Sequence, residues 1–403
     1  MRKLMERRSG WALAVLLALA CRAALAQTHR AQQSPSQFDA LAKRAAEARE
    51  AGHADDAAKL YKRALALNPK WSEGWWSLGT LDYDADRFAE AQLEFLKVVA
   101  LDPKQGTARA MLGLCEFEQG QAEKALKDIE AAKALGVLEN TQLRDVVLYH
   151  EGLLLQRAGQ FEGAKAALAS LCLEGVRSAE LAGAFGLVAL RMRDAAPPSS
   201  TTEAGMVVQH VGRGACLSGA KQYEAAKAEF ENVLRRAPHY PLVHYAYGRV
   251  LIDARDRAGA IAQFEAEIAE QPKSALPRLR IAAADYKVDS VAGLKYAEEA
   301  VQLDPNEPLG HYLLGLLLLD TGVYERAVPE LEAARKAFPQ EAKIELSLAT
   351  AYAHVGRTAD AARARAEFAR KKQNSTRQDE GAAGESLNGM LQGTDGAEVA
   401  PKN

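Results

Sequence analysis

The chain has 403 residues and a formal net charge of −2, with 51 basic and 53 acidic residues interleaved along it. A balance of this kind produces no strong electrostatic field, so neither nucleic acid nor an anionic membrane surface is an expected partner. Aromatic residues make up 6% of the sequence, and no stretch alternates like a β-strand, which predicts an all-α protein.

The first 26 residues have the pattern of a secretory signal peptide. Basic residues at the start are followed by the apolar run 11–20 and then by Ala24-Leu25-Ala26, whose small residues suit a signal peptidase. The apolar run is shorter than the ~20 residues that span a bilayer. We therefore expect cleavage before Gln27, no transmembrane segment in the mature chain, and a periplasmic or secreted location. A lipoprotein acylated at Cys21 fits less well, because the Leu before it stands one place late.

Removal of the signal peptide would leave three cysteines, Cys115, Cys172 and Cys216. An odd number of cysteines in an exported chain argues against a disulfide framework. The three residues also fall in different copies of the repeat described next, and helix layers ~8–10 Å apart are expected to hold them too far apart for a bridge. The sequence therefore predicts three free, buried cysteines.

A unit of 34 residues recurs along most of the chain, and its clearest copy runs from Ser72 to Pro103 (SEGWWSLGTLDYDADRFAEAQLEFLKVVALDP). Apolar residues at helical spacing predict two amphipathic helices, the first containing Tyr83 near its end and the second running from Phe88 to Leu101. Neither helix can bury its apolar stripe alone. The unit therefore needs neighbouring copies to be stable.

The copies stay in phase along the chain, with one break. Phe185-Gly186 fits a first helix, but the segment 194–204 (DAAPPSSTTEA) follows where a second helix should be. Adjacent prolines cannot continue a helix, so we expect a loop or hinge that divides two arrays. After Lys371 the sequence has too few large apolar residues to form a core. The predicted organisation is a signal peptide at 1–26, a disordered leader at 27–37, an N-terminal array at 38–193, the break at 194–204, a C-terminal array at 205–371 and a disordered tail at 372–403.

The residues that repeat form a recognisable pattern: W-x2-L-G at the head of the unit, then A-x3-F-x2-A and a closing Pro. In the clearest copy, Val98 replaces the last Ala. This pattern resembles the tetratricopeptide repeat family over about residues 38–371. The resemblance implies an α-solenoid of helix–turn–helix repeats forming a right-handed superhelix, with a concave wall, built from the first helices, that binds peptides or partner domains. The residues that carry it are Trp75, Leu78, Gly79, Ala91, Phe95 and Pro103.

The resemblance also places particular residues on the concave wall. Most of them are aromatic or aliphatic, which predicts an apolar groove for a protein or peptide partner. The alternative, in which part of this stripe is covered core, stays open. The predicted partner-binding residues are Trp76, Thr80, Tyr83, Leu114, Phe117, Tyr149, Tyr245, Arg249, Tyr312 and Leu319.

Relatives that hold the tail of a chaperone use Lys, Asn and Arg on this wall to grip a terminal carboxylate. The matching positions here lack those side chains, so recognition of an acidic C-terminus is not expected. The residues at these positions are Ala42, Ala46, Ser77, Thr107 and Met111.

No constellation of catalytic residues is apparent in the sequence. It has no H-E-x-x-H, C-x-x-C, phosphate loop or G-x-S-x-G, and its histidines are scattered along the repeats. His210, His244 and His311 occupy the position that Trp75 has in its own copy, which favours packing over metal binding. We expect no cofactor, no metal and no enzymatic activity.

The leading hypothesis is an exported bacterial scaffold that binds one or more protein partners without catalysis. One alternative is an accessory factor, possibly a lipoprotein, in the assembly of an envelope machine such as a pilus or the outer membrane. Another is a regulatory subunit of an envelope enzyme. Two arrays could also hold two partners. The sequence does not define the partner, the process or the oligomeric state.

Overall fold

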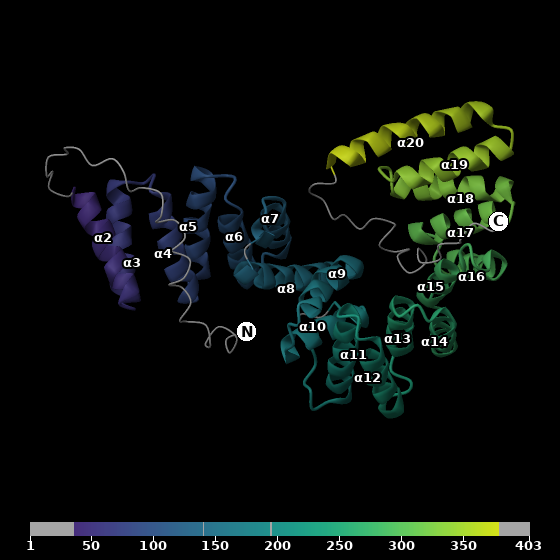
Figure 1. Cartoon of the computed structure of the whole chain (residues 1–403), viewed down its shortest axis with the longest axis horizontal. Coiled ribbons are helices and arrows are strands. Elements are labelled where there is room, and N and C mark those ends of the chain that lie inside the picture. The colour runs from purple at the N-terminus through teal and green to yellow at the C-terminus, as the bar shows by residue number, and fades with distance from the viewer. Residues whose placement is uncertain (1–35, 140, 194–195, 379–403) are drawn as a thin grey trace, which may run out of the picture. The chain divides into compact units, whose positions relative to one another are not determined.

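The computed structural model describes residues 36–139, 141–193 and 196–378, and these ranges consist mostly of helices joined by short turns (Figure 1). They contain no β-strand, which confirms the all-α prediction. The predicted signal peptide lies outside the described residues, as do leader residues 27–35, the first two residues of the break and tail residues 379–403.

Outside the break between α10 and α13, the first helices of the repeats follow one another at about the predicted spacing. Ser36 caps the earliest of them through a hydrogen bond from the Asp39 amide to its hydroxyl (3.1 Å), and the Asp39 carboxylate accepts from the Ser36 amide in return. These first helices are α2 (Gln37–Glu50), α4 (Ser72–Asp84), α6 (Gly106–Glu118), α8 (Thr141–Ala158), α10 (Ala179–Ala189), α11 (Glu203–Gly219), α13 (Val243–Asp253), α15 (Leu276–Asp285), α17 (Pro308–Asp320) and α19 (Ala342–His354).

The second helices complete the pairs, and only α10 lacks a second helix of its own among the described residues. The five residues inserted before the fourth copy include a short 3-10 helix, η1 (Val137–Glu139). The second helices are α3 (Ala54–Leu67), α5 (Phe88–Leu101), α7 (Ala122–Ala134), α9 (Phe161–Leu173), α12 (Tyr223–Arg236), α14 (Arg257–Glu270), α16 (Ser290–Leu303), α18 (Tyr324–Ala337) and α20 (Thr358–Gln378).

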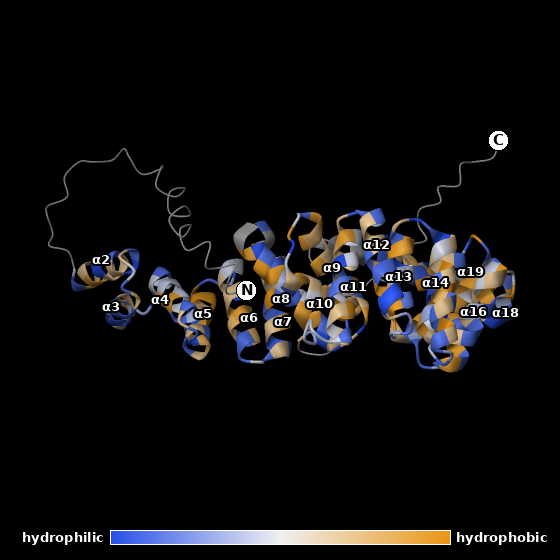
Figure 2. Ribbon diagram, turned by 90° about the horizontal axis from the view of Figure 1, so that it is seen from below, coloured by the Kyte–Doolittle hydropathy of each residue, from blue (hydrophilic) through white to orange (hydrophobic). Residues whose placement is uncertain are grey.

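The chain divides into two compact units, unit 1 (Met1–Gln119) and unit 2 (Gly120–Asn403). The break predicted from the sequence at 194–204 lies inside unit 2, and the division into two arrays at that place stays a prediction. Within each unit a second helix packs on the first helix of its own pair and on the first helix of the next pair, as α5 does on α4 and α6. The helices carry both hydrophobic and hydrophilic residues along their length (Figure 2), as expected of amphipathic helices in a stack.

A glycine on the first helix receives a large side chain from the second helix of the same pair. A Cβ on Gly248 would lie 2.5 Å from the Phe264 ring, and one on Gly79 would lie 3.0 Å from the Phe95 ring. Both phenylalanines are fully buried. The glycines are thus required by the close approach of the ring, and the repeated W-x2-L-G…F pattern reflects this contact.

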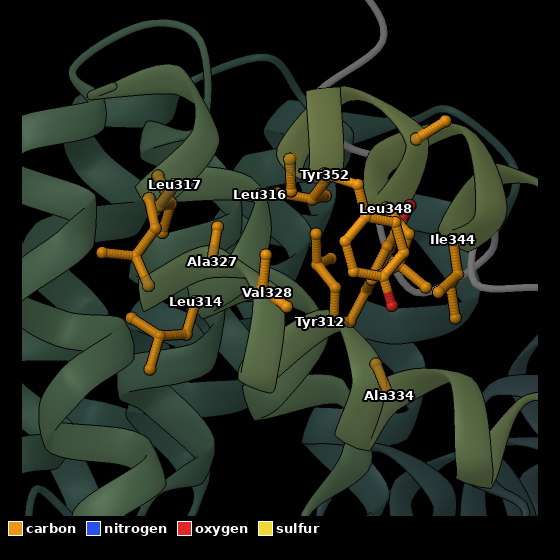
Figure 3. Close-up of a cluster of buried hydrophobic side chains, with 14 of the residues drawn as sticks. Tyr312, Leu314, Leu316, Leu317, Ala327, Val328, Ala334, Ile344, Leu348 and Tyr352 are labelled. Atoms are coloured by element: carbon orange, nitrogen blue, oxygen red, sulfur yellow. The ribbon is translucent and has the colours of Figure 1, made fainter. Parts of the chain in front are cut away.

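The last two repeats of unit 2 share a continuous apolar core (Figure 3). Tyr312 and Leu316 of α17 lie against Leu348 and Tyr352 of α19 in this cluster. The final helix, α20, continues to Gln378, beyond the array boundary predicted at residue 371. At the predicted boundary itself, Lys371 Nζ donates to the buried Glu345 carboxylate at 2.7 Å and so links α20 to α19.

The break in the repeat brings α10 and α11 together. Among the described residues, the segment contains no helix up to Thr202, whose hydroxyl accepts from the Gly205 amide (3.0 Å) and begins α11. A Cβ on Gly186 would overlap the Val208 carbonyl oxygen, and one on Gly212 would overlap a carbonyl of α10. The two helices therefore touch backbone to backbone, which only glycines permit.

A disulfide joins Cys172 of α9 to Cys216 of α11, with a Cα–Cα distance of 5.3 Å. The prediction that both cysteines are free is therefore wrong. The spacing argument assumed that each helix layer lies only against the next, whereas α11 packs directly against α9 as well as α10. Among the described residues, no second helix separates α10 from α11. Cys115 is free and buried, as predicted.

Candidate partner-binding surface

The ten residues predicted to line a concave wall differ in their exposure. Leu114, Tyr245 and Tyr312 have at most 2% of their surface exposed and pack in the core, so they offer no surface to a partner. The apolar positions of a first helix thus include residues that the neighbouring helices cover as well as residues that stay partly exposed. The other seven are partly exposed: Trp76, Thr80, Tyr83, Phe117, Tyr149, Arg249 and Leu319.

Four of the partly exposed residues lie on α4 and α6 of unit 1, and we name them the aromatic stripe: Trp76, Thr80, Tyr83 and Phe117. The first three follow one another by one helical turn on α4. The Trp76 ring meets the Phe95 ring edge-on at 5.5 Å, and the Tyr83 ring meets Phe88 at 5.3 Å.

These contacts hold the aromatic rings of α4 in place. Trp76 and Tyr83 both pack against the core cluster that includes Phe95 and Cys115. Both residues are nevertheless partly exposed. Rings fixed in this way bind with little loss of side-chain entropy, which is the property of a binding anchor.

Acidic groups surround one end of the aromatic stripe. Burial raises the pKa of the Tyr83 hydroxyl, and the charges of Glu118, Asp84 and Asp86 raise it further. Asp84 is exposed, but partial loss of solvent around its carboxyl group raises its pKa, against the opposing charge of Arg49. The electrostatic environment at this end of the stripe is therefore negative.

In unit 2, the surroundings of Tyr245 and Arg249 of α13 are charged, whereas the sequence predicted an apolar groove there. Both belong to a charged cluster around Glu162 of α9. The Arg249 guanidinium donates to both Glu162 carboxylate oxygens, at 2.9 and 2.5 Å. Arg280 of α15 donates to Glu162 at 2.7 Å and to the Tyr245 hydroxyl at 3.2 Å. Arg249 is thus held by an intramolecular ion pair.

A second carboxylate lies beside this cluster. Lys165 Nζ donates to the Asp253 carboxylate at 2.8 Å, and the Ser218 hydroxyl donates to the same oxygen at 3.2 Å.

The two arginines decide the charge of Glu162. Burial would raise the pKa of Glu162, but Arg249 and Arg280 lower it to about 2. The Glu162 carboxylate is therefore ionised at neutral pH.

Sequence reasoning missed Glu162, Lys165, Asp253 and Arg280. The 34-residue period relates each repeat to its neighbours, whereas Glu162 is 87 residues from Arg249 and 118 from Arg280. No local signal in the sequence links such positions.

The remaining predicted residues of unit 2 lie at separate places. Tyr149 of α8 is half-buried, with its ring edge-on to His150 at 5.6 Å. Leu319 of α17 packs at the edge of the C-terminal core.

A cavity of about 330 Å³ lies between α18, α19 and α20. It is lined mainly by charged residues that pair with one another. Arg357 donates to Asp360 at 2.6 Å and lies over the Tyr352 ring at 4.4 Å, while the Tyr352 hydroxyl donates to Glu332 at 2.6 Å. This mutual pairing makes the cavity a weaker binding candidate than the aromatic stripe.

The histidines at the Trp75 position connect the two helices of their repeats. His210 Nδ1 lies 2.6 Å from a Glu229 carboxylate oxygen, while His244 Nδ1 donates to Gln263 at 2.7 Å and His311 Nδ1 to Glu330 at 2.6 Å. Within the described ranges, no three His, Cys, Asp or Glu side chains are grouped so as to hold a metal ion. None of the described helices is both long and apolar enough to cross a bilayer.

The fold and the aromatic stripe define an α-solenoid of helix pairs with fixed, partly exposed rings. The model of the tetratricopeptide repeat family matches residues 77–136, 217–275, 290–342 and 312–375, together more than half of the sequence. The chain belongs to the tetratricopeptide repeat family and has the architecture of a protein-interaction scaffold. No curated protein matches the sequence significantly.

Several solved structures are similar in fold. A tetratricopeptide repeat protein from Parabacteroides merdae is 15% identical, covering 70% of this chain and 98% of that one, with a TM-score of 0.32. MamA from Desulfovibrio magneticus is 20% identical, with coverages of 42% and 97% and a TM-score of 0.36. A chain of the APC/C hetero-tetramer Cut9–Hcn1 is 12% identical, covering 84% of this chain and 88% of that one, with a TM-score of 0.35. Similarity at this level carries no inference about a partner.

Proposed function

We propose that this protein is an exported, non-catalytic adaptor that binds a protein or peptide partner on the aromatic stripe of unit 1. The observation that carries the proposal is the placement of Trp76 and Tyr83, whose rings are fixed by the core on one side and partly exposed on the other. Aromatic residues in this setting are the side chains most often found at the energetic centre of interfaces.

Two features support an exported location. The first is the signal-peptide pattern of residues 1–26. The second is the Cys172–Cys216 disulfide, because stable disulfides belong mainly to oxidising compartments such as the bacterial periplasm.

The binding site is tested with a substitution that leaves the core intact. Thr80 stands between Trp76 and Tyr83 on α4 and is partly exposed, so Thr80→Arg would place a long charged side chain across the aromatic stripe. Leu93→Arg is the matched control, since Leu93 is 64% exposed on α5 of the same unit.

Each variant is used at full mature length to capture partners from envelope extract, after circular dichroism has shown the fold to be intact. We expect the wild type and Leu93→Arg to capture the same partner and Thr80→Arg to lose it. Equal capture by all three proteins would place binding elsewhere and refute the aromatic stripe as the site.

The location is tested by sequencing the N-terminus of the protein isolated from the producing cells. A mature chain that starts at Gln27 and whose Cys172 and Cys216 resist alkylation until they are reduced is the expected result. Retention of Met1 in the cytoplasm would contradict export, and an acylated Cys21 would favour a lipoprotein.

A further inference from the structure

The carboxylates at one end of the aromatic stripe indicate the charge of the partner, which the aromatic rings alone do not. Asp84 ends α4, directly after Tyr83, and Asp86 stands in the turn before α5. Both residues are exposed, and neither side-chain carboxylate forms a hydrogen bond or ion pair with any part of the chain that the structure describes. Glu118 of α6, which has contacts of its own, adds its charge from the neighbouring first helix.

The basic groups next to these carboxylates are engaged with other partners. Arg87, which follows Asp86 in the sequence, donates to the buried Asp82. Three carboxyl groups act on Tyr83, and Arg49 of α2 is the cation that acts on Asp84. The Arg49 guanidinium is also engaged, because it donates to the Ser77 hydroxyl at 3.2 Å. An aromatic face with carboxylates beside it suits a cationic group, which gains both from the ring and from the charges.

We propose that the aromatic stripe of unit 1 binds a partner segment in which an aromatic or aliphatic anchor is followed by Arg or Lys. The anchor lies against Trp76, and the cationic group lies against Tyr83 beside Asp84 and Asp86. This inference rests on the proposed function and adds the charge of the partner to it. An acidic segment is repelled at the same place, in agreement with the missing carboxylate clamp.

The probe is a library of random twelve-residue peptides displayed on phage and selected on the full mature chain. We expect the enriched peptides to carry aromatic or aliphatic residues next to Arg or Lys. A representative enriched peptide is then synthesised, together with a version in which citrulline, the neutral analogue, replaces each Arg and acetyl-lysine replaces each Lys. The neutral version should bind about tenfold more weakly, and raising the salt concentration should reduce the difference.

The matched variants are Asp84→Asn with Asp86→Asn, and Asp55→Asn with Asp56→Asn. Asn suits position 86, where φ is 59°, because it tolerates the left-handed region. Asp55 and Asp56 are exposed on α3 of the same unit. The first pair should weaken the basic peptide about tenfold while leaving the neutral version unchanged, and the second pair should leave both unchanged.

The outcomes separate this inference from the proposed function. Enrichment of neutral or acidic peptides that Thr80→Arg abolishes would keep the binding site and refute the cationic partner. Basic peptides that bind the Asp84→Asn, Asp86→Asn variant as tightly as the wild type would refute it as well. If no peptide is enriched, or if Thr80→Arg binds every enriched peptide normally, both proposals fail.

Discussion

At the residue scale, the least conventional group is the buried carboxyl pair of Glu94 and Asp82 in unit 1. Asp82 is fully buried and accepts from Arg87 Nε at 2.9 Å. Glu94 Oε2 and Asp82 Oδ2 have no hydrogen-bond partner among the described residues. Burial, followed by the charge of Asp82, raises the pKa of Glu94 to about 8, so Glu94 is largely protonated at neutral pH and can share its proton with Asp82.

The pair predicts a pH dependence of stability. Because the folded-state pKa of Glu94 lies above its ordinary value of 4.5, its stabilisation is complete below about pH 4.5 and is lost as the pH rises through about 8. Glu94→Gln mimics the protonated form and should be more stable than the wild type at pH 9 but similar at pH 5. Thermal melts of both proteins at pH 5, 7 and 9 measure this difference in stability.

Glu90→Gln, at an exposed position of the same helix, is the control. A pH-independent difference between Glu94→Gln and wild type would disprove the shared proton.

The two fully buried phenylalanines, Phe95 and Phe264, provide a second prediction at this scale. Each fills the space above a glycine of the facing helix, so truncation to Ala leaves a cavity. We expect each substitution to lower the free energy of unfolding by about 3–5 kcal/mol. Leu93→Ala, at an exposed position, should change it by about 0.5 kcal/mol or less. Urea denaturation gives the values, and an unchanged midpoint for Phe95→Ala or Phe264→Ala would show that its ring is not part of the core.

At the scale of elements, the fifth repeat determines how unit 2 is built. Its first helix, α10, packs on α11 through Gly186 and Gly212, and α11 also contacts α9. The described residues of the segment up to Thr202 contain no helix, as the adjacent prolines predict. The neighbouring helices close the gap because each would otherwise expose its apolar face.

The Cys172–Cys216 disulfide should stabilise this contact between α9 and α11. The bridged residues are 44 positions apart in sequence, and the entropy of closing such a loop in the unfolded chain corresponds to at most about 4 kcal/mol. Replacing both cysteines by Ser should therefore lower the free energy of unfolding by up to about 4 kcal/mol, as urea denaturation can measure. Dithiothreitol should destabilise the wild type but not this variant. The same response to the reductant in both proteins would contradict a disulfide at this place.

At the scale of the whole molecule, contacts between distant repeats distinguish unit 2 from a simple stack. In a solenoid each repeat touches its neighbours, and stability is close to a sum of nearest-neighbour terms. In unit 2, Glu162 of α9 pairs with Arg249 of α13 and Arg280 of α15. These ion pairs join repeats that lie on either side of the break, so we infer that this part of unit 2 unfolds cooperatively.

Glu162→Gln tests this cooperativity. Loss of the carboxylate removes the negative charge that faces two partly buried guanidinium groups, which should cost about 3 kcal/mol. Hydrogen exchange should then rise together in α9, α13 and α15. Glu224→Gln removes an exposed carboxylate that pairs with Lys227, and should cost about 0.5 kcal/mol or less. A local rise confined to α9 in Glu162→Gln would show that the distant repeats are independent.

Acid should have the same effect on the wild type. The folded-state pKa of Glu162, about 2, lies below its ordinary value of 4.5. Its stabilisation is therefore present above about pH 4.5 and is lost as the pH falls toward 2. Glu162→Gln should lack this component of acid unfolding, which a pH titration followed by circular dichroism would show.

The sequence predicted the fold in more detail than it predicted the candidate site. The helix pairs and their phase follow from local periodicity, because a 34-residue repeat of apolar residues has one efficient way to be buried. Whether Trp76 or Tyr245 stays exposed does not follow, since both are aromatic and occupy equivalent stripes. Their exposure depends on which neighbouring helices cover them.

The sequence by itself determined the all-α class, the helix–turn–helix unit, the glycine positions and the interruption at Pro197-Pro198, since each depends on residues within one or two turns or one repeat. Tertiary structure alone decided the Cys172–Cys216 bridge and the Glu162 cluster. These contacts join residues that are far apart in the chain, and they arise because a missing second helix lets non-consecutive helices pack together. A local sequence pattern depends only on residues close together in the chain, so it does not indicate which distant helices will pack together. The disulfide and the Glu162 cluster are therefore apparent only in the folded chain.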